Sequence, residues 1–151
     1  MLTRPAVRCG ALALALATLG LAACGESGDK KFRSDVNAIC KRLNTDTKNL
    51  DNVSDLPAIA REGRKAIPAI TRAEDKLKGL KVTKDVKDKY GDRYTEFLKT
   101  FLDTTSTLGR LIVTAEQGDQ KGAQQLVQQG TALERKNQAQ AKKLGFTECA
   151  K

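Results

Sequence analysis

The chain has 151 residues, a formal net charge of +9, and no histidine or tryptophan. The absence of histidine excludes a Ser-His-Asp or Cys-His catalytic centre and removes the commonest protein ligand of zinc and iron. Since no catalytic motif, phosphate-binding loop or zinc-ligand spacing occurs either, we expect a protein that is not an enzyme and carries no metal or other cofactor. The length fits one domain with a modest hydrophobic core.

Residues 1–23 have the order of a lipoprotein signal peptide. Two arginines precede an apolar run at 10–21, which is shorter than the roughly 20 residues that span a bilayer. The run ends in Leu-Ala-Ala-Cys, which resembles a bacterial lipobox, so we expect Cys24 to be lipidated with acyl chains such as palmitate. The location would then be the extracytoplasmic face of the cell membrane. An uncleaved N-terminal anchor and an ordinary signal peptide followed by a cysteine are the alternatives.

The four cysteines can be assigned by elimination. Cys9 would be discarded with the signal peptide and Cys24 would carry the lipid, which leaves Cys40 and Cys149 in an oxidising compartment. We therefore expect a disulfide between these two, with two free buried thiols or an intermolecular bond as alternatives. Closing a loop of about 100 residues contributes up to about 4.7 kcal/mol on chain-entropy estimates.

The expected order of elements begins with the lipidated N-terminus and a polar linker over 24–31, followed by one domain over 32–151. Apolar residues that recur at steps of three, four or seven predict a first helix over about 32–52. The positions on this face are Phe32, Val36, Ile39, Leu43, Leu50 and Val53.

A second helix is expected over about 56–80. Ser54 or Asp55 can cap its start, and Pro57 fits its first turn. Pro68 lies inside the apolar pattern and should kink the helix or divide it.

The third and fourth helices are expected over about 84–117 and 120–144. Gly91 weakens the third by roughly 1 kcal/mol relative to alanine. The fourth is rich in glutamine and has the least apolar face, and Gly145 is a natural stop. No segment shows the two-residue alternation of a strand.

Four amphipathic helices with short connections predict an all-α, antiparallel up-down four-helix bundle. In this topology the fourth helix ends beside the start of the first, which brings Cys149 near Cys40. The helix count and the cysteine assignment were inferred separately, and they agree.

Two stretches of the sequence resemble stretches found in a known group of proteins. Asn-Ala-Ile-Cys-Lys-Arg-Leu opens the first helix at 37–43, and Ala-Lys-Lys-Leu-Gly-Phe-Thr-Glu-Cys closes the domain at 141–149. With the signal and the linker, this pattern resembles small membrane-anchored lipoproteins of actinobacteria such as Streptomyces. The resemblance implies a helical domain with one disulfide at the cell envelope, and it implies no activity.

Nearly all of the excess positive charge falls on the half of the bundle that would lie next to the lipid anchor. We expect this half to rest on anionic lipid headgroups or anionic cell-wall polymer, because basic residues are attracted to an anionic surface within a Debye length. The alternative is a solvated surface with an incidental asymmetry. Nucleic acid is excluded by the expected compartment and by the lack of interleaved aromatics. The residues proposed for this contact are Lys76, Lys78, Lys81, Lys84, Lys87 and Lys89.

A small-ligand pocket is a second possibility. Tyr90 and Tyr94 lie one helical turn apart, and Thr105 belongs to a run of four hydroxyl residues at 104–107. The alternative is that the tyrosines pack in the core and the hydroxyls bond to carbonyls one turn back. The expected function is a non-enzymatic interaction or structural module at the envelope, docking an unidentified protein or polymer; a ligand-binding or sensing bundle is the alternative.

Overall fold

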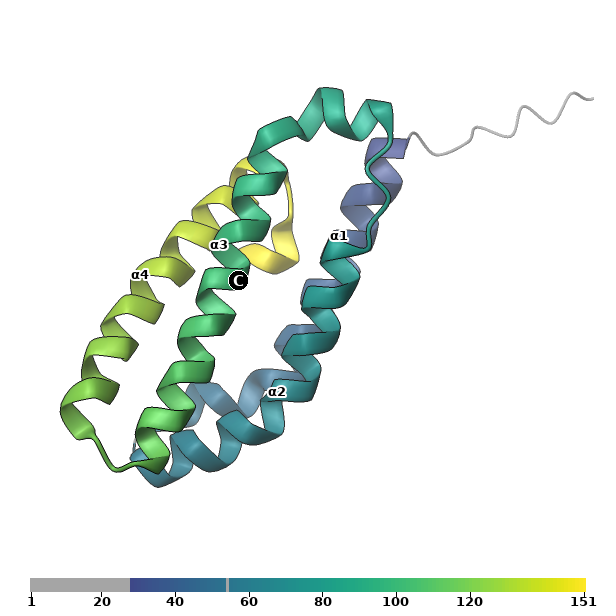
Figure 1. Cartoon of the computed structure of the whole chain (residues 1–151). Helices are drawn as coiled ribbons and strands as arrows, with labels where there is room; N and C mark the ends of the chain where they lie inside the picture. Colours follow the sequence, from purple (N-terminus) through teal and green to yellow (C-terminus); the bar gives the residue numbers. More distant parts are fainter. Residues whose placement is uncertain (1–27, 54) are drawn as a thin grey trace, which may run out of the picture.

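The computed structural model describes residues 28–53 and 55–151, and within them the chain forms helices and no strand. The helices run alternately down and up as an antiparallel bundle (Figure 1), which confirms the predicted all-α fold. The expected signal peptide, Cys24 and Ser54 lie outside the described residues. The elements are α1 (Gly28–Thr47), η1 (Lys48–Asn52), α2 (Leu56–Lys78), α3 (Lys84–Glu116), α4 (Gln120–Leu144) and η2 (Thr147–Ala150).

The first helix differs from its predicted range at both ends. It begins at Gly28, inside the segment expected to be a linker, and its α-helical part ends at Thr47 instead of 52. The last turn contains Asn, Thr and Asp, whose side chains compete for backbone hydrogen bonds; the Thr47 hydroxyl donates to the Leu43 carbonyl at 2.9 Å. The remaining residues to 52 continue as the 3₁₀ turns of η1.

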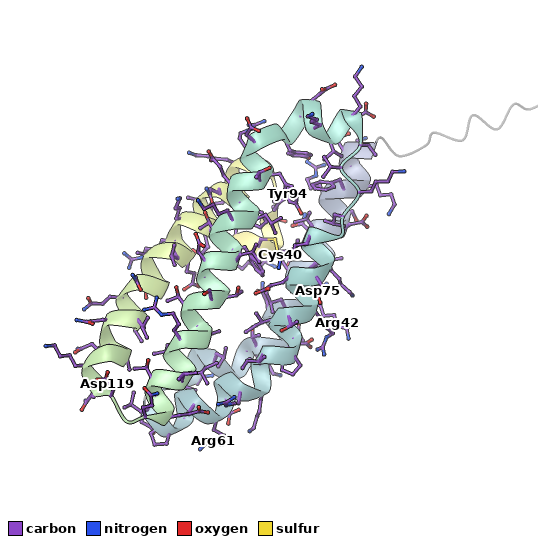
Figure 2. The ribbon with its side chains drawn as sticks, in the orientation of Figure 1. Cys40, Arg42, Arg61, Asp75, Tyr94 and Asp119 are labelled. Carbon is purple, nitrogen blue, oxygen red and sulfur yellow. A yellow bond between two sulfur atoms is a disulfide. The ribbon has the colours of Figure 1, made fainter. Side chains whose placement is uncertain are left out.

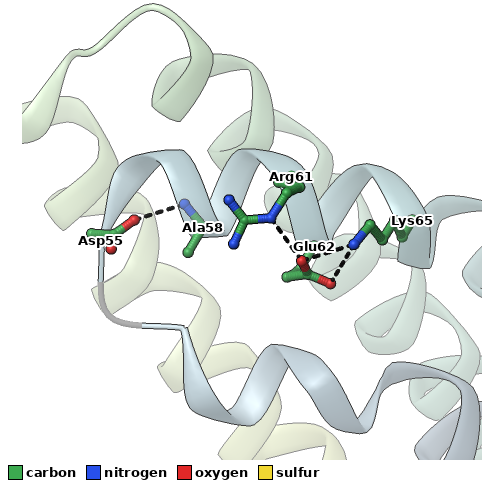
Figure 3. Close-up of polar contacts among 5 residues, drawn as sticks. All are labelled: Asp55, Ala58, Arg61, Glu62 and Lys65. Atoms are coloured by element: carbon green, nitrogen blue, oxygen red, sulfur yellow. Dashed lines mark hydrogen bonds and ion pairs between the residues drawn. The ribbon is translucent and has the colours of Figure 1, made fainter.

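The start of α2 is fixed by Asp55. Its carboxylate accepts a hydrogen bond from the Ala58 backbone at 2.7 Å, and Pro57 occupies the first turn (Figure 3). The helix stays continuous across Pro68, whose ring is exposed to solvent. Its first turns cross one end of the bundle and its later turns run along it (Figure 1), as a proline kink predicts.

One turn beyond its cap, α2 carries a small charged cluster (Figure 3). Glu62 accepts hydrogen bonds from Lys65 at 3.0 Å and from Arg61 at 2.9 Å. These two cations, Lys65 foremost, hold the pKa of Glu62 below its usual value. The cluster is open to solvent, so it contributes little to the stability of the fold.

The third helix is broken at Gly91, where a continuous helix was predicted. Gly91 has φ 43° and ψ −132°, a conformation that a residue with a Cβ rarely adopts. The piece from Lys84 to Tyr90 crosses the end of the bundle, and the rest of α3 then runs along it (Figure 1). The expectation that Gly91 only weakens the helix is therefore wrong.

The fourth helix has the predicted bounds. The Asp119 side chain caps its start by accepting from the Gly122 backbone at 2.9 Å, and Gly145 ends it in the left-handed conformation, with φ 75°. The left-handed turn at Gly145 directs the chain back into the bundle, where Phe146 is fully buried.

The core is concentrated in the half of the bundle where α1 begins. Five aromatic rings form its centre, and the centroids of neighbouring rings lie 4.9–6.3 Å apart, in the range of favourable aromatic contacts. Figure 2 shows Tyr94 on this side of the molecule, whereas Arg61 and Asp119 lie at the far end. The rings belong to Phe32, Tyr90, Tyr94, Phe97 and Phe146.

The C-terminal turn η2 lies between α1 and α4. These two helices have little direct contact, but η2 packs on both of them. The sulfur atoms of Cys40 and Cys149 lie 2.01 Å apart, which is disulfide-bonding distance, and join η2 to α1 (Figure 2). The turn is held further by Glu148, whose N–H donates to the Asn37 side chain at 3.0 Å and whose carbonyl accepts from Asn44 at 2.8 Å.

Candidate functional site

Six exposed lysines gather at one end of the bundle, which we call the basic end. They lie in the last turns of α2, in the α2–α3 turn, and in the short piece of α3 ahead of Gly91. The break at Gly91 turns this piece across the end of the molecule (Figure 1). The members are Lys76, Lys78, Lys81, Lys84, Lys87 and Lys89.

The start of α1 lies against the basic end. A Cβ atom on Gly28 would stand 3.2 Å from the Thr83 hydroxyl and 3.7 Å from the Asp85 carboxylate. One residue further, Asp29 forms an ion pair with Lys89. Gly28 follows Cys24 by four positions, and a chain of that length reaches at most about 14 Å.

Four of the six lysines of the basic end, Lys76 among them, form no ion pair with a described residue. Lys78 pairs with Glu74 at 3.5 Å, and Lys89 pairs with Asp29. The side chains of Lys81, Lys84 and Lys87 form no ion pair or hydrogen bond with any residue in the described part of the chain. Beside them Val82 is 51% exposed, so an apolar side chain stands among free cations.

Tyr90 and Tyr94 are core residues and line no pocket. Tyr90 is 4% exposed and packs against Phe32 and Phe146. The Tyr94 hydroxyl donates to the Leu77 carbonyl at 2.8 Å, and burial raises its pKa to about 12. Both rings thus lie in the packed interior, and neither is among the residues that line the groove described below.

Thr105 lies away from the two tyrosines, about 16 Å along α3 from Tyr94 at the helical rise per residue. Its hydroxyl bonds to Glu74 on α2 and to the Leu102 carbonyl, the latter at 2.9 Å. The hydroxyls of Thr104 and Thr107 donate to carbonyls one turn back, both at 2.8 Å. The structure does not bring Tyr90, Tyr94 and Thr105 together as one site.

Thr105 does lie on the wall of a different feature, which the sequence did not reveal. A groove of about 480 Å³ opens in the half of the bundle beyond the disulfide, where α1 and α4 are not in contact. We call it the α1–α4 groove. Its lining includes Leu43, Leu50, Leu108, Leu111, Leu126 and Val127.

The apolar face of the fourth helix could have indicated this groove. It is sparse in the sequence, and a helix with so few apolar positions cannot close a bundle along its full length. Leu43, Leu50, Leu108 and Leu111 accordingly stay only half-buried, although each lies on the inward face of its helix.

Three further findings bear on function. No cluster of three potential metal ligands of the His, Cys, Asp or Glu type occurs in the described residues. None of the helices from Gly28 onward combines the length and the apolar character that crossing a bilayer requires. No protein-family profile, curated protein or solved structure matches the chain.

Proposed function

We propose that the protein is a non-enzymatic lipoprotein on the extracytoplasmic face of the cell membrane, held by a lipid on Cys24, with its basic end resting on an anionic surface. The signal-like order of residues 1–24 is the basis for the anchor and the location. The protein acts as an interaction module, and the bundle beyond the basic end projects from the membrane.

The observation that carries the proposal is the contact of the first turn of α1 with the α2–α3 turn. This contact holds the α2–α3 turn and Lys89 against the start of α1, and Gly28 lies within about 14 Å of the residue that would carry the lipid. Each basic residue near an anionic membrane contributes about 1 kcal/mol, and the attraction fades beyond a Debye length of about 8 Å at physiological salt. The lipid and the basic end would thus act as two additive membrane signals.

The proposal is tested with residues 24–151 carrying Cys24→Ser, a form that lacks both the apolar segment of the signal-like region and the lipid. It should sediment at low salt with vesicles containing phosphatidylglycerol and remain in solution with phosphatidylcholine vesicles. Replacing Lys81, Lys84 and Lys87 with glutamine should weaken this binding roughly 100-fold, because three contributions of about 1 kcal/mol are lost.

The matched control replaces three exposed lysines away from the basic end, Lys48, Lys121 and Lys136, and should retain the binding. Equal losses in the two triple variants would contradict the proposal, because binding would then follow total charge alone. Soluble polyphosphate serves as a competitor to separate the two anionic surfaces: preferential binding to it indicates a wall polymer, and preferential binding to vesicles indicates headgroups.

A further inference from the structure

We propose that the α1–α4 groove binds an uncharged molecule with a long alkyl chain and a hydroxyl at one end. The groove lies in the half of the bundle opposite the basic end, and the proposal does not depend on any anionic surface.

The size of the groove favours a thin ligand. Its volume of about 480 Å³ falls within the range of about 300–1,000 Å³ that is usual for small-molecule sites. An alkyl chain is as thin as one apolar side chain, so it fits between the walls of a groove of this size.

The walls offer apolar contact that the protein itself does not use. The packed core cluster ends near Phe101, with Leu43 of α1 at its edge, and the half-buried Leu50 of η1 and Leu108 and Leu111 of α3 lie outside it. Covering them removes apolar surface from water, which stabilises the bound state by about 0.8 kcal/mol for each methylene group buried. An extended peptide gains less here, because helices present no free backbone groups with which it could pair.

The polar groups on the walls do not favour a charged ligand. The hydroxyl groups of three threonines on the walls donate hydrogen bonds to carbonyls of their own helices, with oxygen–oxygen distances of 2.8–2.9 Å. These are Thr104, Thr107 and Thr131. Within the described residues, the charged side chains on the lining are Glu134 and Lys151, and Lys151 pairs with Glu148 at 2.7 Å. An anionic headgroup would therefore find no free cation inside the groove.

Asn137 supplies the polar end of the site. It is 8% exposed, lies on the wall of the groove, and donates through Nδ2 to the Phe97 carbonyl at 3.2 Å. Its Oδ1 accepts no hydrogen bond from the rest of the described chain. Oδ1 is not among the fully enclosed unpaired side-chain oxygens of the described residues, so water can reach it, and a ligand hydroxyl that donates to it would replace that water.

The test uses 1-decanol as the probe and residues 24–151 with Cys24→Ser, in detergent-free buffer. Titration calorimetry should show saturable binding of one molecule per chain, with a binding enthalpy that becomes more negative on warming, as apolar burial requires. Decyl sulfate should bind at least about tenfold more weakly, because its charge has no partner in the groove. Absence of saturable decanol binding, or equal affinity for the two probes, would overturn the proposal.

Two helical glycines offer a matched pair of variants. A Cβ on Gly130 would meet nothing closer than the Thr107 methyl at 3.9 Å, and Gly130 lines the groove, so Gly130→Leu should place its side chain in the groove. Gly109 also has open space but does not line the groove. Gly130→Leu should weaken decanol binding at least about tenfold, the equivalent of about two methylene groups, and Gly109→Leu should leave it unchanged.

A second pair of variants keeps the test decisive if circular dichroism shows that a leucine variant is not properly folded. Thr104→Phe places a ring in the groove, whereas Ser106→Phe places one on the exposed face of the same helix. Decanol binding that survives both groove-filling changes in folded protein would overturn the assignment of the site.

Discussion

Gly91 has a larger effect on the molecule than any other single residue in α3. Its positive φ lets the chain leave the helical path and turn the lysine-bearing piece across the end of the bundle. Nothing lies within 4 Å of the place where a Cβ would be, so the constraint on this position comes from its backbone conformation and not from crowding.

We expect Gly91→Ala to lower the free energy of unfolding by about 2 kcal/mol, since residues held in glycine-only conformations cost on the order of 1–3 kcal/mol. Gly109→Ala provides the contrast, because Gly109 lies in regular helix and alanine there should raise stability by up to about 1 kcal/mol. Urea denaturation of the two variants measures both changes. A stabilised Gly91→Ala protein would show that α3 is straight.

Tyr94 makes the free energy of unfolding depend on pH in the alkaline range. Because its pKa in the folded protein is raised from 10.0 to about 12, the neutral form favours folding; the stabilisation is complete below pH 10 and is lost as the pH rises toward 12. Tyr94→Phe removes the bond to Leu77 and should cost about 1 kcal/mol at neutral pH. Unfolding at pH 8 and pH 11 should show a smaller alkaline loss for the variant, and identical losses would contradict this assignment.

At the scale of the elements, η2 is the part that joins the first and last helices. Since α1 and α4 have little direct contact, the spacing between them depends on a turn of four residues and one pair of cysteines. Phe146, just ahead of the turn, anchors it in the core.

Replacing Cys40 and Cys149 together with serine should lower the free energy of unfolding by about 2–5 kcal/mol, the usual cost of removing a native disulfide from a small domain. The measurement is urea denaturation of the double variant beside the parent protein under reducing and oxidising conditions. Reductant should destabilise the parent to a similar degree and leave the variant unchanged. A parent protein insensitive to reductant would show that the bond does not form.

The start of α2 with a cap at Asp55, the bounds of α4 and the glycine stop at Gly145 could be predicted because each depends on local chemistry that the sequence displays directly. The break in α3 could not, because a glycine in a helix weakens it or breaks it according to tertiary packing. The groove was missed for a related reason. Apolar periodicity shows which face of a helix points inward, but not whether an opposite helix comes close enough to cover it.

The candidate residues show the same division. The lysines were placed correctly at one end, because their positions follow from helix order alone. Tyr90 and Tyr94 lie in the core, which the sequence could not indicate because an aromatic pair has the same spacing whether it lines a cavity or fills a core. Only Thr105, of the three residues proposed for a pocket, lies on a groove wall.

At the scale of the whole molecule, the bundle is uneven along its length. One half holds the aromatic cluster and the disulfide, and the other holds the groove and half-buried leucines. Local stability follows the density of buried apolar contacts, so the two halves should open at different free energies.

Native-state hydrogen exchange should therefore be slowest at core residues such as Phe97 and Leu77 and markedly faster in the α3–α4 turn and the adjoining turns of both helices. The expected protection decreases along α3 from Phe97 toward Glu116. Adding 1-decanol should slow exchange around Leu108 and Leu111 and leave Phe97 unchanged. Uniform protection along α3 would contradict the proposed unevenness.

The position of the disulfide also determines how the chain would carry mechanical force. A pull applied between Gly28 and Lys151 passes through α1 as far as Cys40, crosses the sulfur atoms, and leaves through the last residues after Cys149. Residues 41–148 form a closed covalent loop outside that path. A tether held at the N-terminal end could thus unwind one short helical segment under load, while the basic piece of α3, the groove and most of the core remained folded.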